Sequence, residues 1–183
     1  MSKPENLDHL PGQLAAPRRN GRPLKFGGGP PNYLQNALTA AAEPFKGNTT
    51  DGAVVSGLFP ITATGVSTQS IREAAEAYLG SLSAPQRARA LFAVDAKEWR
   101  LWSNIHRTIM RHGIPLCEMS DQQVERALAL LKESFSDRGF TTARDIMRLN
   151  ETVGEMTGRF DEFGDDLYWL SIMGTPSATE PWG

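Results

Sequence analysis

The uneven distribution of glycine and proline along this chain of 183 residues constrains its fold more than any other feature. Residues 1–66 contain 9 glycines and 8 prolines, whereas residues 67–183 contain only 8 glycines and 4 prolines. A segment rich in both does not sustain long helices, because glycine costs backbone entropy and proline lacks an N–H donor. We therefore expect a loop-rich N-terminal arm over residues 1–66 and a helical half-domain over residues 67–183.

The arm contains one stretch that is typical of a short helix. Residues 33–42 carry apolar side chains at helical spacing and lie between a proline pair and Pro44. Residues 52–59 are compatible with either a short strand or a buried extended loop. The other apolar residues of the arm are too scattered to close a core, so we expect it to wrap over the half-domain as an extended segment.

The half-domain contains four candidate helix starts of the capping-box type. In a capping box, the first side chain and one three residues later satisfy backbone N–H groups that the helix leaves free. The candidate pairs are Ser70 with Glu73, Ser83 with Gln86, Asp95 with Glu98, and Ser120 with Gln123. Apolar residues recur at helical spacing after each pair, which predicts helices over about 70–82, 83–92, 95–111 and 120–138.

A further helix is predicted between residues 141 and 156. Its apolar stripe consists of Ala143, Ile146, Leu149, Val153 and Met156. Gly139 is interpreted as the glycine that ends the preceding helix in a left-handed conformation. Because the connection is short, we expect these two helices to form an antiparallel helical hairpin.

The end of the chain combines an acidic connector with a predicted strand. Residues 167–174 are rich in aromatic and β-branched side chains, which favours one buried strand. The helical part offers this strand no obvious partner, and Trp182 has little chain after it to pack against. We therefore expect a mainly α fold of four or five helices with one late β-strand, forming an incomplete α+β domain.

Composition and charge exclude several classes of protein. Hydrophobic residues make up 40 % of the chain and the net charge is −2, which excludes a strongly basic nucleic-acid binder. The single cysteine, Cys117, excludes an internal disulfide and is interpreted as a buried structural thiol. We expect a cytoplasmic protein with no nucleic-acid or membrane partner, since the sequence has neither a signal peptide nor an apolar run of about 20 residues.

Two charged clusters are interpreted as solvated segments. The basic cluster, in which a nucleic-acid or lipid contact is the alternative, consists of Arg18, Arg19, Arg22 and Lys25. The acidic cluster lacks the ligand spacing of an EF-hand and consists of Asp161, Glu162, Asp165 and Asp166. Gly27–Gly29 lacks the context of a phosphate-binding loop and is interpreted as a turn.

The histidines and tryptophans allow a functional and a structural interpretation. His9, His106 and His112 do not have metal-ligand spacing, and surface or capping roles are favoured. Asp95, Trp99, Trp102 and His106 would share one helical face. That face is either a substrate platform or, as we favour, a helix cap followed by core tryptophans, with Trp99 more buried than Arg100.

The order of short motifs is more informative than any single residue. The motifs are Ser83–Arg87, Trp102–Asn104, Arg111–Leu116, Met119–Gln123, Phe135–Phe140, Tyr168–Ser177 and Pro181–Gly183. From about residue 66 to the last residue, this succession resembles the bacterial family called domain of unknown function 3500. Met119 and Phe135 depart from its pattern. The resemblance gives four substrate-binding candidates, which are Trp102, Asn104, Arg111 and Tyr168.

The resemblance also implies a partner for this half-domain. Longer members of the family continue from the position of Trp182-Gly183 into a segment of Gly-His-His type, so we expect an incomplete unit. Its partner would be a missing C-terminal half or a second chain, and a homo-oligomer stays open. The predicted function is the N-terminal half of a metal-assisted hydrolase or lyase. A divalent metal would bind in the full-length form, with no ligand within this chain. The alternative is a non-catalytic helical binding or scaffold module.

Overall fold

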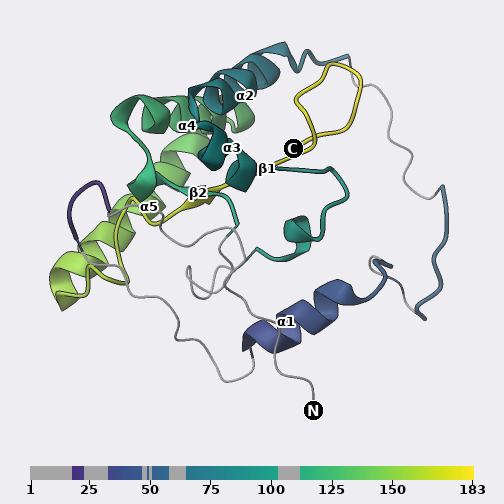
Figure 1. Cartoon of the computed structure of the whole chain (residues 1–183), viewed down its shortest axis with the longest axis horizontal. Coiled ribbons are helices and arrows are strands. Elements are labelled where there is room, and N and C mark those ends of the chain that lie inside the picture. The colour runs from purple at the N-terminus through teal and green to yellow at the C-terminus, as the bar shows by residue number, and fades with distance from the viewer. Residues whose placement is uncertain (1–17, 23–32, 47–48, 50, 58–64, 103–111) are drawn as a thin grey trace.

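The computed structural model describes residues 18–22, 33–46, 49, 51–57, 65–102 and 112–183, and within them the chain is mainly helical (Figure 1). The helices of these residues are α1 (Tyr33–Ala42), α2 (Gln69–Ser81), α3 (Ala84–Ala90), α4 (Asp121–Ser134) and α5 (Asp137–Thr157). The strands are β1 (Leu91–Phe92), β2 (Ile114–Pro115), β3 (Trp169–Leu170) and β4 (Ile172–Met173). Two 3₁₀ turns, η2 (Lys97–Arg100) and η3 (Leu116–Glu118), complete the set. The predicted mainly α fold with a late strand is confirmed.

Two of the predicted capping boxes are present as predicted. Ser83 and Ser120 each accept a hydrogen bond from the backbone N–H three residues later, and the glutamine at that position reaches back. The prediction for Ser70 is wrong, because Ser70 already lies in the first turn of α2. That helix begins at Gln69, and Thr68, its N-cap residue, makes no side-chain capping bond.

The helix predicted from Asp95 is wrong in the part that the structure describes. Ala96 precedes the 3₁₀ turn η2 and makes no side-chain cap, and residues 103–111 lie outside the described residues. Trp99 is 40 % exposed, which is more than Arg100, so the predicted order of their burial is also wrong.

Arg100 is less exposed than Trp99 because its guanidinium forms hydrogen bonds at the C-terminal end of α1. The last carbonyls of a helix have no intrahelical partner. The Arg100 guanidinium donates to the carbonyls of Ala40, Ala41 and Glu43 at 2.8, 3.0 and 2.7 Å. The α1 helix lies apart from α2–α5 (Figure 1), and this contact helps to hold it against η2.

The boundaries and the buried face of α5 differ from the prediction. Ser136 caps the helix by accepting from the Gly139 N–H, so Gly139 lies in its first turn and does not end α4. The predicted apolar stripe runs from Ala143 to Met156. Its members Ile146, Leu149, Val153 and Met156 are exposed, whereas Met147 and Gly154 are buried.

The antiparallel helix pair of the core is formed by α2 and α4. The Gln123 side chain at the start of α4 donates to the Ser81 carbonyl at the end of α2, at 2.9 Å. Ile71 near the start of α2 and Leu130 near the end of α4 line the same groove. The expected hairpin partner, α5, packs less extensively on α4 than α2 does. The core includes Ala75, Tyr78, Leu79, Ala127 and Leu130.

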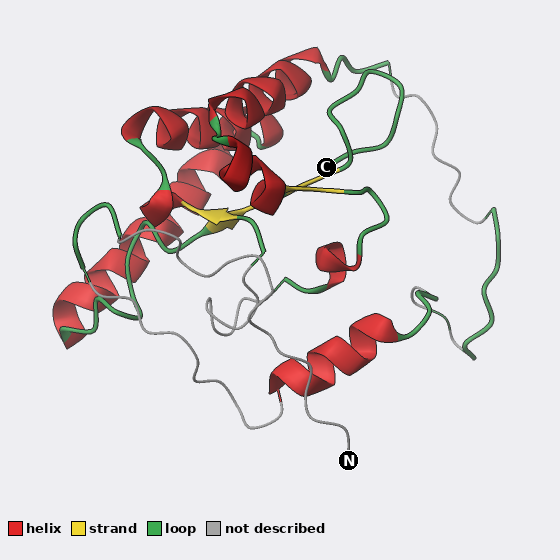
Figure 2. Cartoon of the chain, viewed as in Figure 1, coloured by secondary structure: helices red, strands yellow, loops and turns green. Residues whose placement is uncertain are grey.

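The late segment forms two short strands rather than one strand without a partner (Figure 2). Strand β3 pairs antiparallel with β2, and β4 pairs parallel with β1. The expectation of an unpaired strand is therefore wrong, and so is the assignment of Leu91 and Phe92 to the end of a helix. Gly183 exchanges two backbone hydrogen bonds with Met173, and Trp182 packs against the core, so its apolar surface is used.

One buried ion pair joins the basic cluster to the acidic cluster. Arg18 is 3 % exposed, and its guanidinium donates to both carboxylate oxygens of Asp166, which is 5 % exposed. Arg22 pairs with Glu151, and Arg19 pairs with Asp121. The fourth basic residue, Lys25, lies outside the described residues. The interpretation as solvated is therefore wrong for Arg18 and Asp166, whereas Arg19 is exposed.

The remaining predictions for the arm have mixed outcomes. The helix predicted over residues 33–42 is confirmed as α1. Residues 52–57 form no strand, and the rest of the stretch to residue 59 lies outside the described part. The domain boundary at residue 66 stays a prediction. Among the described residues, no helix is long and apolar enough to cross a membrane.

Candidate functional site

The strand pairing brings His112 and Ser171 into contact. His112 directly precedes Gly113 and β2, and Ser171 is the residue between β3 and β4. The Nδ1 atom of His112 lies 3.0 Å from the Ser171 Oγ, although the two residues are 59 positions apart. Both residues are half-buried. A hydroxyl within hydrogen-bond distance of an imidazole nitrogen is the arrangement that proton transfer requires.

The surroundings of His112 favour its neutral form. Burial lowers the pKa of His112 below its usual value, while a hydrogen bond with the Leu101 backbone and the negative charge of Glu98 act in the opposite direction. The ring also meets the Phe92 ring edge-on, with centroids 5.9 Å apart. At neutral pH the imidazole is therefore uncharged.

The neutral imidazole ring has two tautomers, and a role of His112 as a base toward Ser171 uses one of them. One ring nitrogen carries the N–H and the other carries a lone pair, and this choice sets which partner donates in the contact with Ser171. In the tautomer with the proton on Nε2, Nδ1 carries the lone pair and accepts from the Ser171 hydroxyl. In this tautomer His112 can take the hydroxyl proton as a base.

The structure describes only two of the four substrate-binding candidates, Trp102 and Tyr168. Trp102 is 68 % exposed and follows Leu101, the residue that contacts His112. Tyr168 is half-buried against the core, and its carbonyl accepts from the Leu116 N–H. Burial, and then the charge of Asp165, raise the pKa of the Tyr168 hydroxyl. Asn104 and Arg111 lie outside the described residues, so their site roles stay predictions.

Sequence reasoning missed both members of the His112–Ser171 pair. His112 was interpreted as a surface or capping residue, and Ser171 was interpreted only as part of a strand. A signal was present, since both residues lie inside the motifs Arg111–Leu116 and Tyr168–Ser177 that carry the family resemblance. The sequence does not show that β2 pairs with β3, and this pairing makes the two motifs neighbours.

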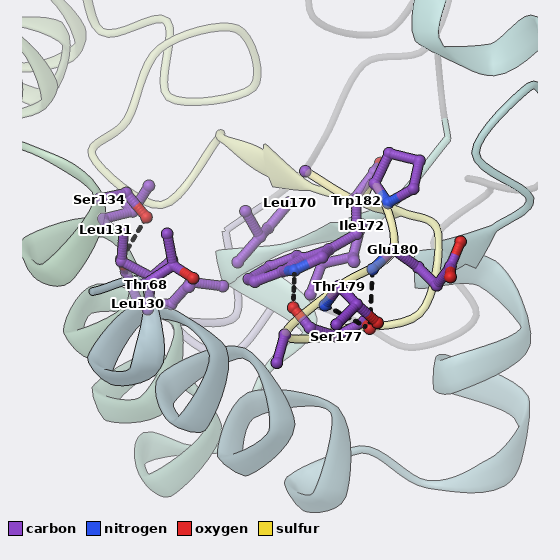
Figure 3. A pocket seen from close by; sticks show the side chains of 15 residues that line it. Thr68, Leu130, Leu131, Ser134, Leu170, Ile172, Ser177, Thr179, Glu180 and Trp182 are labelled. Carbon is purple, nitrogen blue, oxygen red and sulfur yellow. Dashed lines mark hydrogen bonds between the residues drawn. The ribbon is translucent and has the colours of Figure 1, made fainter. Parts of the chain in front are cut away.

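An apolar groove of about 600 Å³ runs beside the same strands. Leu130 and Leu131 lie on one side of it, and Ser177 and Thr179 lie on the other (Figure 3). The Trp182 indole reaches between the two sides, with its Nε1 donating to the Ser177 carbonyl at 2.9 Å. Ser171 is also among the lining residues, so the groove adjoins the His112–Ser171 pair.

Other reactive groups of the described chain fit catalysis less well. Cys117 is confirmed as a buried thiol, and burial, followed by the charge of Asp166, raises its pKa to about 12. A thiol with so high a pKa is a poor nucleophile. Among the described residues, no three His, Cys, Asp or Glu side chains lie close enough together to hold a metal ion.

Comparisons with known proteins identify a family but no characterised relative. The family model described as "Protein of unknown function (DUF3500)" matches residues 64–183. No curated protein and no solved structure matches the chain. The matched range includes α2–α5, all four strands, His112 and Ser171. Because this range is more than half of the chain, the protein belongs to the DUF3500 family.

Proposed function

We propose that the chain contributes to the active site of a hydrolase or lyase in which His112 is the general base. The observation that carries this proposal is the 3.0 Å contact between the His112 Nδ1 and the Ser171 Oγ. The lowered pKa of His112 supports it, because a neutral imidazole ring can accept a proton. The group that gives up its proton to His112 is either the Ser171 hydroxyl or a water molecule.

The proposal predicts a large effect of His112→Gln on turnover. Glutamine retains hydrogen-bonding capacity beside Ser171 but cannot act as a base at neutral pH. We expect kcat/KM for chromogenic ester and amide substrates to fall by about 10²- to 10⁴-fold, the usual contribution of a general base. Circular dichroism of the variant serves as the control for folding. Equal rates for the variant and the parent chain would refute the proposal.

The pH dependence has a defined direction under the same proposal. The neutral form of His112 is the active one, and burial lowers its pKa. Activity should therefore persist to a pH below about 6.5, the usual value for histidine, and be lost only when the ring becomes protonated.

The alternative function, a non-catalytic binding module, is favoured by the apolar groove. Its volume of about 600 Å³ lies in the range of small-molecule sites. A binding module would bind an apolar ligand without converting it, and His112→Gln would leave this affinity unchanged. The absence of turnover together with such binding would favour the alternative.

A metal ion is part of the proposal only for a longer form of the protein. The described residues alone do not supply a set of three ligands, so no chemical step is assigned to a metal here. We propose that histidines after Gly183, in a C-terminal half or a second chain, would complete the site in a cytoplasmic enzyme. Self-association into a homo-oligomer is also proposed.

Elemental analysis tests the metal proposal directly. We expect no stoichiometric, tightly bound metal in the 183-residue chain and one in a longer natural form, because histidine pairs are good ligands for divalent metals. Stoichiometric metal in the short chain would contradict the expectation that its ligands lie after Gly183. A longer form without metal would favour the binding-module alternative.

A further inference from the structure

We infer that Ser171 is a nucleophile that forms a covalent acyl-enzyme with uncharged carboxylic esters. This inference rests on the proposed function, since it needs His112 as the base. It goes further, because a general base can also activate water and leave the serine unmodified. The inference is based on the direct contact between the His112 Nδ1 and the Ser171 Oγ, which lie 3.0 Å apart.

The backbone holds Ser171 in place from both sides. The preceding residues Trp169 and Leu170 pair with β2, and the following residues Ile172 and Met173 pair with β1. Met173 also exchanges backbone hydrogen bonds with Gly183 at 2.7 and 2.9 Å. A reactive group anchored on two paired strands keeps its orientation toward the base, which is a requirement for efficient attack.

The covalent step balances without a further reactant. The Ser171 Oγ forms a bond to the carbonyl carbon of the ester while its proton passes to the His112 Nδ1. The bond from that carbon to the leaving alkoxide breaks, and the imidazolium returns the proton to the alkoxide. Water then attacks the acyl carbon while His112 takes its proton. The bond from that carbon to the Ser171 Oγ breaks, and the imidazolium returns the proton to Oγ, which releases the acid and the free serine.

The surroundings of the pair indicate the class of ester. The Phe92 ring provides an apolar neighbour for the His112 ring. Glu98 lies close enough to act on the His112 pKa, and its negative charge would repel an anionic substrate. Ser171 is also one of the residues that line the apolar groove, together with Leu170 and Ile172. These features favour an uncharged, apolar acyl group.

A fluorophosphonate probe tests the nucleophile without knowledge of the natural substrate. Such a probe reacts with an activated serine: an Oγ–P bond forms, the P–F bond breaks, and fluoride leaves while the proton passes to the base. We expect labelling of the full chain at one site, which mass spectrometry of its peptides places at Ser171. Ser171→Ala should abolish labelling, and His112→Gln should slow it by about 10²-fold or more.

A matched control and the ester kinetics separate the two proposals. Ser81→Ala removes a hydroxyl that donates to the Tyr78 carbonyl outside the groove, and it should leave labelling unchanged. If His112→Gln abolishes hydrolysis of p-nitrophenyl butyrate but Ser171→Ala does not, the nucleophile is water and this inference is overturned while the proposed base stands. Labelling at another serine, or none at any, would overturn it as well.

Discussion

Replacing Asp166 by alanine is expected to lower the free energy of unfolding by about 3–5 kcal/mol. The substitution removes one partner of a buried ion pair and leaves the Arg18 guanidinium without its carboxylate. A domain of this size has a total stability of only about 5–15 kcal/mol, so the variant should unfold at markedly lower denaturant concentration. Urea unfolding followed by tryptophan fluorescence measures the change.

The size of this effect follows from the number of contacts that Asp166 makes. Its carboxylate accepts from the Arg18 Nε at 3.4 Å, from the Arg18 Nη2 at 2.5 Å, and from the Asn20 side chain at 3.1 Å. The Arg18 side chain is completely buried and also donates to the Phe160 carbonyl. Removal of the carboxylate would therefore leave a positive charge in a site that excludes water.

The exposed pair between Arg19 and Asp121 provides a matched control. Its carboxylate is 92 % exposed, and Asp121→Ala should cost less than about 1 kcal/mol. The double variant Arg18→Met with Asp166→Leu should recover part of the stability lost in Asp166→Ala, because no buried charge is left alone. A cost below about 1 kcal/mol for Asp166→Ala would contradict its assigned role.

The features that the sequence predicted well depend on neighbouring residues. The capping boxes at Ser83 and Ser120 involve contacts over three positions, and the helix over residues 33–42 is bounded by proline. Local hydrogen bonds of this kind can be recognised in a sequence because both partners are visible in one short window. The apolar stripe of α5 is exposed, because periodicity identifies an apolar face of a helix but not whether another element covers that face.

The features that the sequence missed depend on contacts between distant residues. Arg18 and Asp166 are 148 positions apart, and each looks like a solvated charge when its own segment is read alone. His112 and Ser171 become neighbours only through the pairing of β2 with β3, two strands of two residues each. Strands this short leave almost no periodic signal, so neither the sheet nor the candidate site could be derived from local patterns.

The second large effect is expected at Gly113, next to the candidate site. Gly113→Ala should lower the free energy of unfolding by about 3 kcal/mol or more, from two additive causes. The backbone has φ +90°, a left-handed conformation that costs a residue with a Cβ about 1–2 kcal/mol. A Cβ would also lie 2.5 Å from the Ser171 Oγ and 2.6 Å from the Leu170 carbonyl oxygen.

The overlap at Gly113 cannot be relieved by moving a side chain alone. The Leu170 carbonyl belongs to β3, which is paired with β2, so the strands would have to separate. Overpacking of a buried site costs about 1–3 kcal/mol. The same displacement would move Ser171 away from His112, so fluorophosphonate labelling should fall even in the fraction of molecules that stays folded.

Gly158→Ala separates the conformational cost from the steric cost. Gly158 has φ +69° at the end of α5, and a Cβ there would meet nothing within 4 Å. This variant should therefore cost only about 1–2 kcal/mol, the left-handed part, and should keep full labelling at Ser171. Equal costs for the two variants would show that Gly113 does not approach Ser171 closely. Gly113→Ala with unchanged labelling would show that reactivity does not depend on the contact between His112 and Ser171.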